Sequence, residues 1–268
     1  MTRPALFRYK VFIRSGPFIA PALMLLSLGL FFLAVTALWA GTAPIAPAAP
    51  EEKTNDVFMH EDFRSLDNWM PYRLFKNKKE TVYTPGIKNG VSCVKAESDG
   101  SSSALAYKKE FDVYEFPVVK WKWMVANLYP KGNIKKKATN DSPARLYILF
   151  KYEPSKAGFF KRIEYALAKT KFGIYPPGSS LCYLWGNHPH KERIITSPAW
   201  KNSKDVVLEG GPEHLNEWRE EQINIVADYR AAFGIDPPHT AAIAIMNNSD
   251  NMGGKATSWF GPIEVLAE

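Results

Sequence analysis

Hydrophobic and polar residues alternate in several short runs along this chain. Val119, Trp121 and Trp123 are separated by Lys120 and Lys122. A period of two predicts a strand with one buried face, so we expect both indoles to lie buried on the same strand face. The same period recurs within residues 146–152, 181–185 and 243–245.

Shorter apolar runs predict further strands at residues 57–63, 93–96, 104–111, 194–197, 206–208 and 257–266. Turn-forming pairs such as Asn89-Gly90 and Gly210-Gly211 separate them. About ten short strands with this punctuation predict a mostly β fold. We expect an antiparallel β-sandwich of the jelly-roll or concanavalin-like kind, with one or two short helices.

Two segments have a helical pattern. Residues 155–170 begin at a capping serine and end before Gly173, and Phe160, Ile163 and Leu167 form a stripe suited to packing. Either this helix covers the sandwich with its basic residues in solvent, which the pattern favours, or it lies on anionic lipid. Those basic residues are Lys156, Lys161, Arg162, Lys169 and Lys171. A second short helix is expected at 226–233, before Gly234.

The first 55 residues have a different pattern. Residues 1–16 form a basic flank, 17–40 are uncharged and apolar, and 41–55 are rich in proline and alanine. The apolar run is long enough to span a bilayer, with its basic end in the cytoplasm. A cleaved signal peptide is the alternative, since Ala46-Pro47-Ala48 resembles a cleavage site. Under both interpretations, residues 56–268 form one β-sandwich domain that lies on the far side of the membrane from the cytoplasm.

The distribution of charge bears on nucleic-acid binding, and the two cysteines bear on disulfide formation. The chain carries +7, but residues 1–50 hold four basic and no acidic residues, so the rest has 30 basic against 27 acidic. Nucleic acid is therefore not an expected partner. Cys93 and Cys182 lie in strand-like runs, where they are either buried thiols or a disulfide formed after export. No residue spacing indicates a metal or another cofactor.

Several ordered segments resemble a bacterial family catalogued as domain of unknown function 3047. They are residues 140–145 (NDSPAR), 175–178 (YPPG) with 181–185 (LCYLW), 228–230 (DYR) with 233–234 (FG), and 245–251 (IMNNSDN). The resemblance covers about residues 63–265 and implies an envelope-associated, mostly β domain without an assigned reaction. Combined with the basic flank and apolar run of residues 1–40, it predicts a single-pass protein of the bacterial inner membrane with its C-terminal domain in the periplasm, or export after signal cleavage.

The chain departs from that family at three positions. The resemblance implies carboxylates where Asn140, Asn248 and Pro262 stand. If the family's acidic positions form a cation or catalytic site, two amides and a proline weaken it here.

Polar residues in the family-like segments form the candidate ligand-binding site. Because loops at strand ends often carry function, we expect these residues to converge at one end or face of the sandwich. The set is Asp141, Arg145, Tyr183, Trp185, Asp228, Asp250 and Asn251. Calcium at Asp250 is a weaker interpretation than an Asx-rich turn, and no catalytic residue is assigned.

Aromatic content suggests the class of ligand. Seven tryptophans lie beyond residue 55, and indoles either fill cores or stack on sugar rings. Three hypotheses follow: a non-catalytic module that binds a glycan or similar polar ligand, a glycosidase-like hydrolase using acidic residues, and a membrane-tethered scaffold for another envelope protein. The first leads. A close pair of carboxylates in a cleft would favour the second.

Overall fold

The computed structural model describes residues 56–72, 79–172 and 175–268. All of them belong to one compact unit, Glu52–Glu268. The expected basic flank, membrane segment and linker at 1–16, 17–40 and 41–55 lie outside the described residues. No helix in the described part of the chain is long and apolar enough to cross a bilayer.

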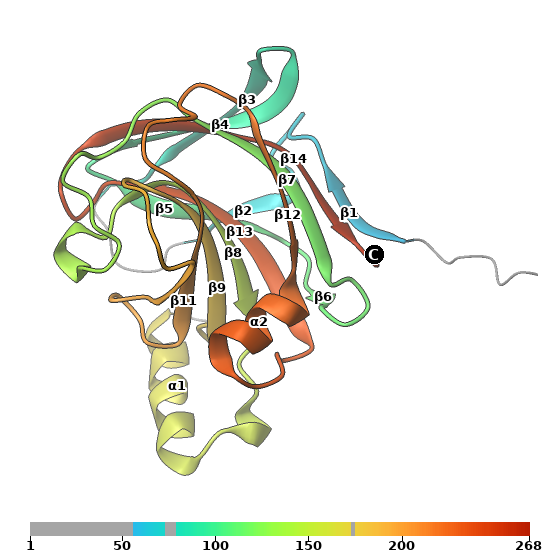
Figure 1. The fold of residues 1–268 in the computed structure, drawn as a ribbon. Helices are drawn as coiled ribbons and strands as arrows, with labels where there is room; N and C mark the ends of the chain where they lie inside the picture. Colours follow the sequence, from blue (N-terminus) through green and yellow to red (C-terminus); the bar gives the residue numbers. More distant parts are fainter. Residues whose placement is uncertain (1–55, 73–78, 173–174) are drawn as a thin grey trace, which may run out of the picture. The chain divides into compact units, whose positions relative to one another are not determined.

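Two sheets pack against each other (Figure 1). The six-stranded sheet has the order β12 (Arg219–Asn224), β7 (Val118–Val125), β14 (Lys255–Leu266), β4 (Val91–Asp99) and β3 (Val82–Lys88), with β1 (Val57–Glu61) also paired to β14. The eight-stranded sheet has the order β10 (Ile194–Thr196), β11 (Ser203–Gly210), β9 (Ser179–Gly186), β8 (Ser142–Phe150), β13 (Thr240–Asn248), β5 (Ser102–Tyr107) and β2 (Trp69–Tyr72), with β6 (Phe111–Asp112) also paired to β13.

The mostly β, two-sheet prediction is confirmed, but the all-antiparallel arrangement is wrong at one pair. Strand β11 runs parallel to β9, with Val206 beside Tyr183. Residues 187–202, which include β10, connect these two strands. A connection of this length can return the chain to the same end of the sheet, which a tight hairpin cannot.

Aromatic side chains fill the space between the sheets. Trp121 and Trp123 lie on the same face of β7 and are 2% and 0% exposed, as predicted. Trp123 meets Trp185 of β9 edge-on at 6.2 Å between ring centroids, and Trp121 lies 5.7 Å from Tyr183. These contacts tie β7 of one sheet to β9 of the other.

Local signals explain the second helix. Helix α2 (Ile225–Phe233) begins after Asn224, whose side chain accepts a hydrogen bond from the Ala227 amide at 2.9 Å. It ends at Gly234, which has φ of 72°, a left-handed conformation suited to glycine.

The first helix differs from its prediction. A short 3-10 helix, η2 (Pro154–Lys156), precedes α1 (Phe159–Phe172), so Ser155 does not cap α1. The stripe expected to pack on the sandwich is exposed: Phe160 is 84% and Leu167 67% accessible. Figure 1 shows α1 projecting away from the sheets, which is why its apolar face finds no core to contact.

The two cysteines do not pair. Cys93 lies on β4 and Cys182 on β9, which belong to different sheets, and both thiols are free and buried. The buried-thiol interpretation is therefore confirmed.

A candidate polar pocket on the outer face of the eight-stranded sheet

Strands β8, β9 and β13 present different chemistry on their two faces. Side chains alternate along a strand, and Leu146, Tyr183 and Ile245 face the core between the sheets. Their neighbours Arg145 and Cys182 face the other way. We call this second side of the eight-stranded sheet the outer face.

Arg145 of β8 is the centre of a hydrogen-bond network on the outer face. Its Nη2 donates to Oδ1 of Asn140 at 2.8 Å, and its Nε donates to Oδ1 of Asn248 at 3.1 Å. Arg145 is 3% exposed, and it pairs with Met246 of β13 in the sheet register, two residues from Asn248. The planar guanidinium, with its fixed donor directions, thus holds two amide oxygens in place.

Asp141 organises the turn after β13. Its Oδ1 accepts hydrogen bonds from Nδ2 of Asn251 at 2.7 Å and Nδ2 of Asn248 at 2.9 Å, and its Oδ2 accepts from the Met252 amide at 2.9 Å. Burial raises the pKa of this carboxyl, while the bonds from Asn251 and Met252 oppose the rise. Because both oxygens are occupied from within the protein, Asp141 positions the turn rather than the ligand.

Next to Arg145 on the outer face, a row of polar side chains runs across strands β8, β9 and β11. Cys182 of β9 is the register partner of both Tyr147 of β8 and Asp205 of β11. Nη1 of Arg145 lies 3.5 Å from Sγ of Cys182 and 3.9 Å from Oδ1 of Asp205. Burial raises the pKa of the Cys182 thiol to about 12 and that of Asp205 to about 6, although Arg145 opposes both shifts. Cys182 is therefore a protonated thiol and an unsuitable nucleophile.

Asn140, Arg145 and Asn248 form the buried floor of an open pocket of about 340 Å³, and Cys182 and Asp205 lie behind Arg145. The accessible rim carries Lys137, Asp250 and Asn251, all exposed. Lys137 comes from the 3-10 helix η1 (Lys137–Thr139), in the loop between β7 and β8. The pocket is lined by Ser102, Lys137, Asn140, Arg145, Tyr147, Ser197, Ala199, Met246, Asn248, Asp250 and Asn251. Its volume falls within the range of small-molecule sites.

The structure brings four of the seven predicted site residues together: Asp141, Arg145, Asp250 and Asn251. Of the other three, Tyr183 and Trp185 lie on the core side of β9 and Asp228 lies on helix α2. Trp185 is fully buried and Tyr183 donates its hydroxyl hydrogen bond to Oδ2 of Asp228 at 3.0 Å. The expected convergence is therefore incomplete, because Tyr183 and Trp185 lie at odd-numbered positions of β9 and point away from the outer face.

Several pocket residues were absent from the predicted site. Asn140 and Asn248 were noted only as departures from the family pattern, and Pro262 lies in β14 of the other sheet. Tyr147 and Met246 could have been found from alternation, since each shares the outer face with Arg145. Ser197 and Ala199 lie in the long connection between β9 and β11, where no local pattern indicates a site.

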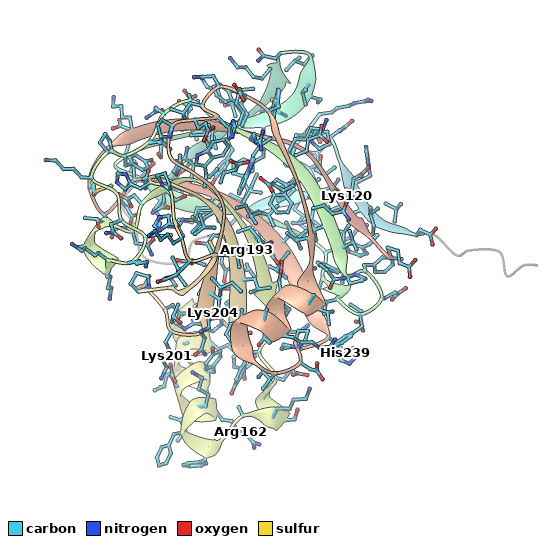
Figure 2. All side chains as sticks on the ribbon, viewed as in Figure 1. Lys120, Arg162, Arg193, Lys201, Lys204 and His239 are labelled. Carbon is cyan, nitrogen blue, oxygen red and sulfur yellow. The ribbon has the colours of Figure 1, made fainter. Side chains whose placement is uncertain are left out.

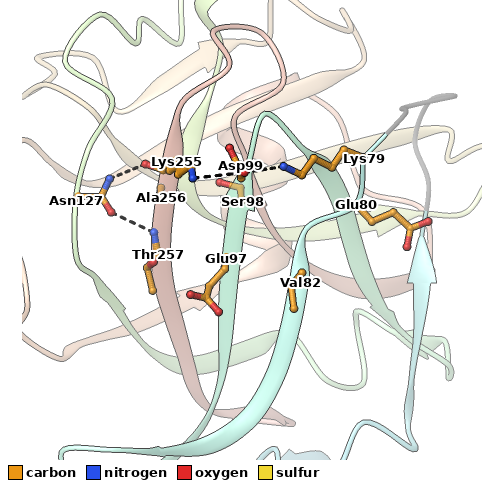
Figure 3. Close-up of a pocket in the computed structure, with 10 residues that line it drawn as sticks. All are labelled: Lys79, Glu80, Val82, Glu97, Ser98, Asp99, Asn127, Lys255, Ala256 and Thr257. Atoms are coloured by element: carbon orange, nitrogen blue, oxygen red, sulfur yellow. Dashed lines mark hydrogen bonds and ion pairs between the residues drawn. The ribbon is translucent and has the colours of Figure 1, made fainter.

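A second hollow, of about 450 Å³, lies beside β3, β4 and β14 (Figure 3). Three of its charged groups pair with one another: Nζ of Lys79 is 2.7 Å and Nζ of Lys255 3.6 Å from Oδ2 of Asp99. The bond from Lys79 lowers the pKa of Asp99. All three side chains are about half exposed or more, so these pairs are weak and easily rearranged. Ser98 is the one buried polar residue of this described lining, whereas Asn140, Arg145 and Asn248 are buried in the outer-face pocket.

Among its described lining residues, neither hollow contains a group of side chains suited to binding a metal ion. Within the described residues, no group of three or more His, Cys, Asp and Glu could hold a metal ion. Asp250 instead accepts a hydrogen bond from Nδ2 of Asn248 at 3.2 Å, and the Gly253 amide bonds to the Ser249 carbonyl at 2.9 Å. These contacts fit the Asx-rich turn better than calcium.

A family model described as "Protein of unknown function (DUF3047)" matches residues 67–264. No curated protein sequence matches the chain. Among solved structures, the glycoside hydrolase domain of Endo-D from Streptococcus pneumoniae R6 is 9% identical with a TM-score of 0.31, and the match covers 75% of this chain but 22% of that one.

Two further solved structures match over most of their length. A thermostable cellulase derived from Cel12A of Rhodothermus marinus is 10% identical, with a TM-score of 0.34 and coverage of 69% of this chain and 87% of that one. A Bauhinia forficata lectin in complex with GalNAc is 11% identical, with a TM-score of 0.29 and coverage of 77% and 96%.

Proposed function

Because the chain belongs to the family described as protein of unknown function (DUF3047), whose name assigns no reaction, we propose a function from the outer-face pocket itself. The pocket binds a neutral, polyhydroxylated ligand, such as a sugar unit of a glycan, without cleaving it. The observation that carries this proposal is the combination of a fixed polar floor and an accessible polar rim around about 340 Å³.

The floor is preorganised for hydroxyl groups. Arg145 holds the oxygens of Asn140 and Asn248, and Nδ2 of Asn248 is fixed by Asp141. Side chains held in one geometry lose little entropy when a ligand binds. At the rim, the Asn251 amide can accept from and donate to the hydroxyls of a polyol, and the Asp250 carboxylate can accept from them.

The charge of the lining favours a neutral ligand. Lys137 and Asp250 stand at the rim with opposite charges, and Arg145 at the floor is close to the buried carboxyl of Asp205. Apolar contact is available from Met246, Ala199 and the half-buried ring of Tyr147. This mixture suits a sugar, which has apolar ring faces and polar edges.

Binding without hydrolysis is the better-supported form of the proposal. Glycoside cleavage by the usual route needs two carboxyl groups about 5–10 Å apart across the ligand. Within the described lining, Asp250 is the accessible carboxylate, while Asp141 is fully buried with both oxygens bonded.

A glycan array tests the proposal with matched variants. The full-length chain, in a detergent without a sugar headgroup, is compared with Asp250→Ala and with Asp99→Ala, an aspartate of the other hollow. We expect wild type and Asp99→Ala to bind the same glycans, and Asp250→Ala to lose at least about tenfold in affinity, as expected when a bound hydroxyl loses a charged partner. An equal signal from Asp250→Ala, or no bound glycan at all, would overturn the proposal.

A further inference from the structure

Helix α1 turns its large apolar side chains toward solvent. Phe159 is 71%, Phe160 84%, Ile163 44% and Leu167 67% exposed. A surface helix of a globular domain normally directs its apolar stripe at the core. Here the apolar stripe lies on the side of α1 that faces away from the core, so it can contact another molecule or a membrane.

The body-facing side of α1 is formed by other residues. Tyr165 is 3% exposed, stacks on Tyr152 at 3.8 Å between ring centroids, and donates its hydroxyl hydrogen bond to the Pro177 carbonyl at 2.8 Å. At 3.6 residues per turn, Ile163 and Leu167 lie nearly opposite Tyr165. The helix is therefore held in place by one side while the other stays apolar and open.

Arg162 borders the open apolar face beside Phe159, and Lys169 lies farther round the helix, about 40° from Tyr165. Arg162 donates to the backbone carbonyls of Ala157 and Ser155, and Lys169 lies over the ring of Tyr175 at 4.6 Å. Within the described part of the chain, neither cation forms an ion pair with a carboxylate, and Glu164, at the other edge of the apolar face, pairs with Lys161 at 3.5 Å. Figure 2 shows Arg162 on the part of α1 that extends away from the sheets.

We propose that α1 docks on the surface of an anionic lipid bilayer. Phe159, Phe160, Ile163 and Leu167 enter the boundary between headgroups and acyl chains, and Arg162 and Lys169 contact lipid phosphates. Apolar side chains on one face with lysine and arginine beside them are the features of helices that lie in the membrane interface.

The sequence outside the described residues gives a reason for this occupant rather than a protein. Residues 17–40 form the apolar run expected to span a membrane, and 41–55 connect it to the domain. Fifteen residues reach at most about 50 Å. A domain tethered that closely meets the bilayer at high effective concentration, so a small docking helix suffices. This inference rests on the expected anchor and is independent of ligand binding in the outer-face pocket.

A fluorescent probe on α1 tests the proposal. Leu167→Cys in the full-length chain is labelled with an environment-sensitive dye, which the buried Cys93 and Cys182 do not compete for. The labelled chain is combined with vesicles of phosphatidylcholine, with or without phosphatidylglycerol, that contain lipid-attached quenchers. Gln222→Cys on the exposed side of β12 carries the control probe.

Docking predicts a blue shift and lipid quenching at position 167 only when phosphatidylglycerol is present, and neither change at position 222. Adding Arg162→Glu and Lys169→Glu should reduce the docked fraction about tenfold or more, with an unchanged circular dichroism spectrum. Solvent-like emission in both vesicle types would overturn the proposal. A blue shift insensitive to lipid quenchers would also overturn it, because it would indicate contact with protein, such as a second copy of the chain.

Discussion

The two faces of strands β8, β9 and β13 are built from alternate residues of the same segments, yet they depend on different physical terms. On the inner face, the rings of Trp185 and Tyr183 mainly fill volume, meeting Trp123 and Trp121 across the core, and each side chain donates one hydrogen bond at its polar end. On the outer face, Arg145 needs specific partners at specific distances. The inner face therefore sets stability, while the outer face carries the pocket for which we propose ligand binding.

The largest effect expected from this comparison is on the inner face. Trp121→Ala or Trp123→Ala should lower the free energy of unfolding by about 3–5 kcal/mol, because each removes a large, fully buried ring. Urea denaturation followed by circular dichroism measures this. A loss below about 1 kcal/mol would mean that the inner face does not carry the stability assigned to it.

A smaller effect is expected from the residue that orders the outer-face turn. Asp141→Ala leaves the amides of Asn251 and Met252 without their acceptor. We expect a loss of about 1–3 kcal/mol in unfolding free energy. Asp99→Ala, at an exposed ion pair, is the control and should change stability by less than about 0.5 kcal/mol. Equal effects from the two variants would contradict the difference in burial.

Glu221, which contacts Trp123 of the inner face, should make the stability of the domain depend on pH. Oε1 of Glu221 accepts a hydrogen bond from Nε1 of Trp123 at 3.1 Å, and burial, reinforced by Glu209, raises the Glu221 pKa from 4.5 to about 7. Since the folded pKa is the higher one, protonation favours folding: the contribution is complete below pH 4.5 and is lost as the pH rises through about 7.

Glu221→Gln should therefore remove part of the pH dependence. Between pH 7.5 and 5, we expect wild type to gain on the order of 1 kcal/mol relative to the variant, a value reduced for the partial exposure of Glu221. Thermal unfolding of both proteins across this range measures the difference. Parallel pH curves would contradict the raised pKa.

The smallest stability effect belongs to the residue most important for the proposed ligand. Asp250 is exposed and accepts one hydrogen bond, from Asn248. Asp250→Ala should change the unfolding free energy by less than about 0.5 kcal/mol while ligand binding is lost. A variant that loses binding together with several kcal/mol of stability would assign Asp250 to the structure of the turn.

Alternation along single strands was enough to predict the core. Trp121 and Trp123 repeat at a period of two, and that period alone places them on one buried face. The same rule, applied to Arg145, would have found Tyr147 on the outer face. Alternation also places Cys182 on the outer face and Tyr183 on the core face. The predicted site was chosen by segment and not by strand face, so it combined Arg145 of the outer face with Tyr183 of the core face.

Other features depend on long-range contacts that the sequence does not show. Ser197 reaches the pocket because β11 returns parallel to β9, and the sequence pattern suggested only antiparallel pairs. The apolar stripe of α1 was expected to pack, since periodicity identifies a helix face without indicating what it contacts. That face is exposed because α1, which precedes β9 in the chain, projects away from the sheets (Figure 1).

The most direct test of the account follows the side-chain amide signals of Asn140, Asn248 and Asn251 by nuclear magnetic resonance. The full-length chain is titrated with neutral monosaccharides, with Asn127 of the other hollow as an internal reference. We expect saturable shifts at the three pocket amides, none at Asn127, and, in Asp250→Ala, shifts that need at least about tenfold more sugar. Shifts at Asn127 alone, or pocket amides that stay unchanged at every sugar concentration, would contradict it.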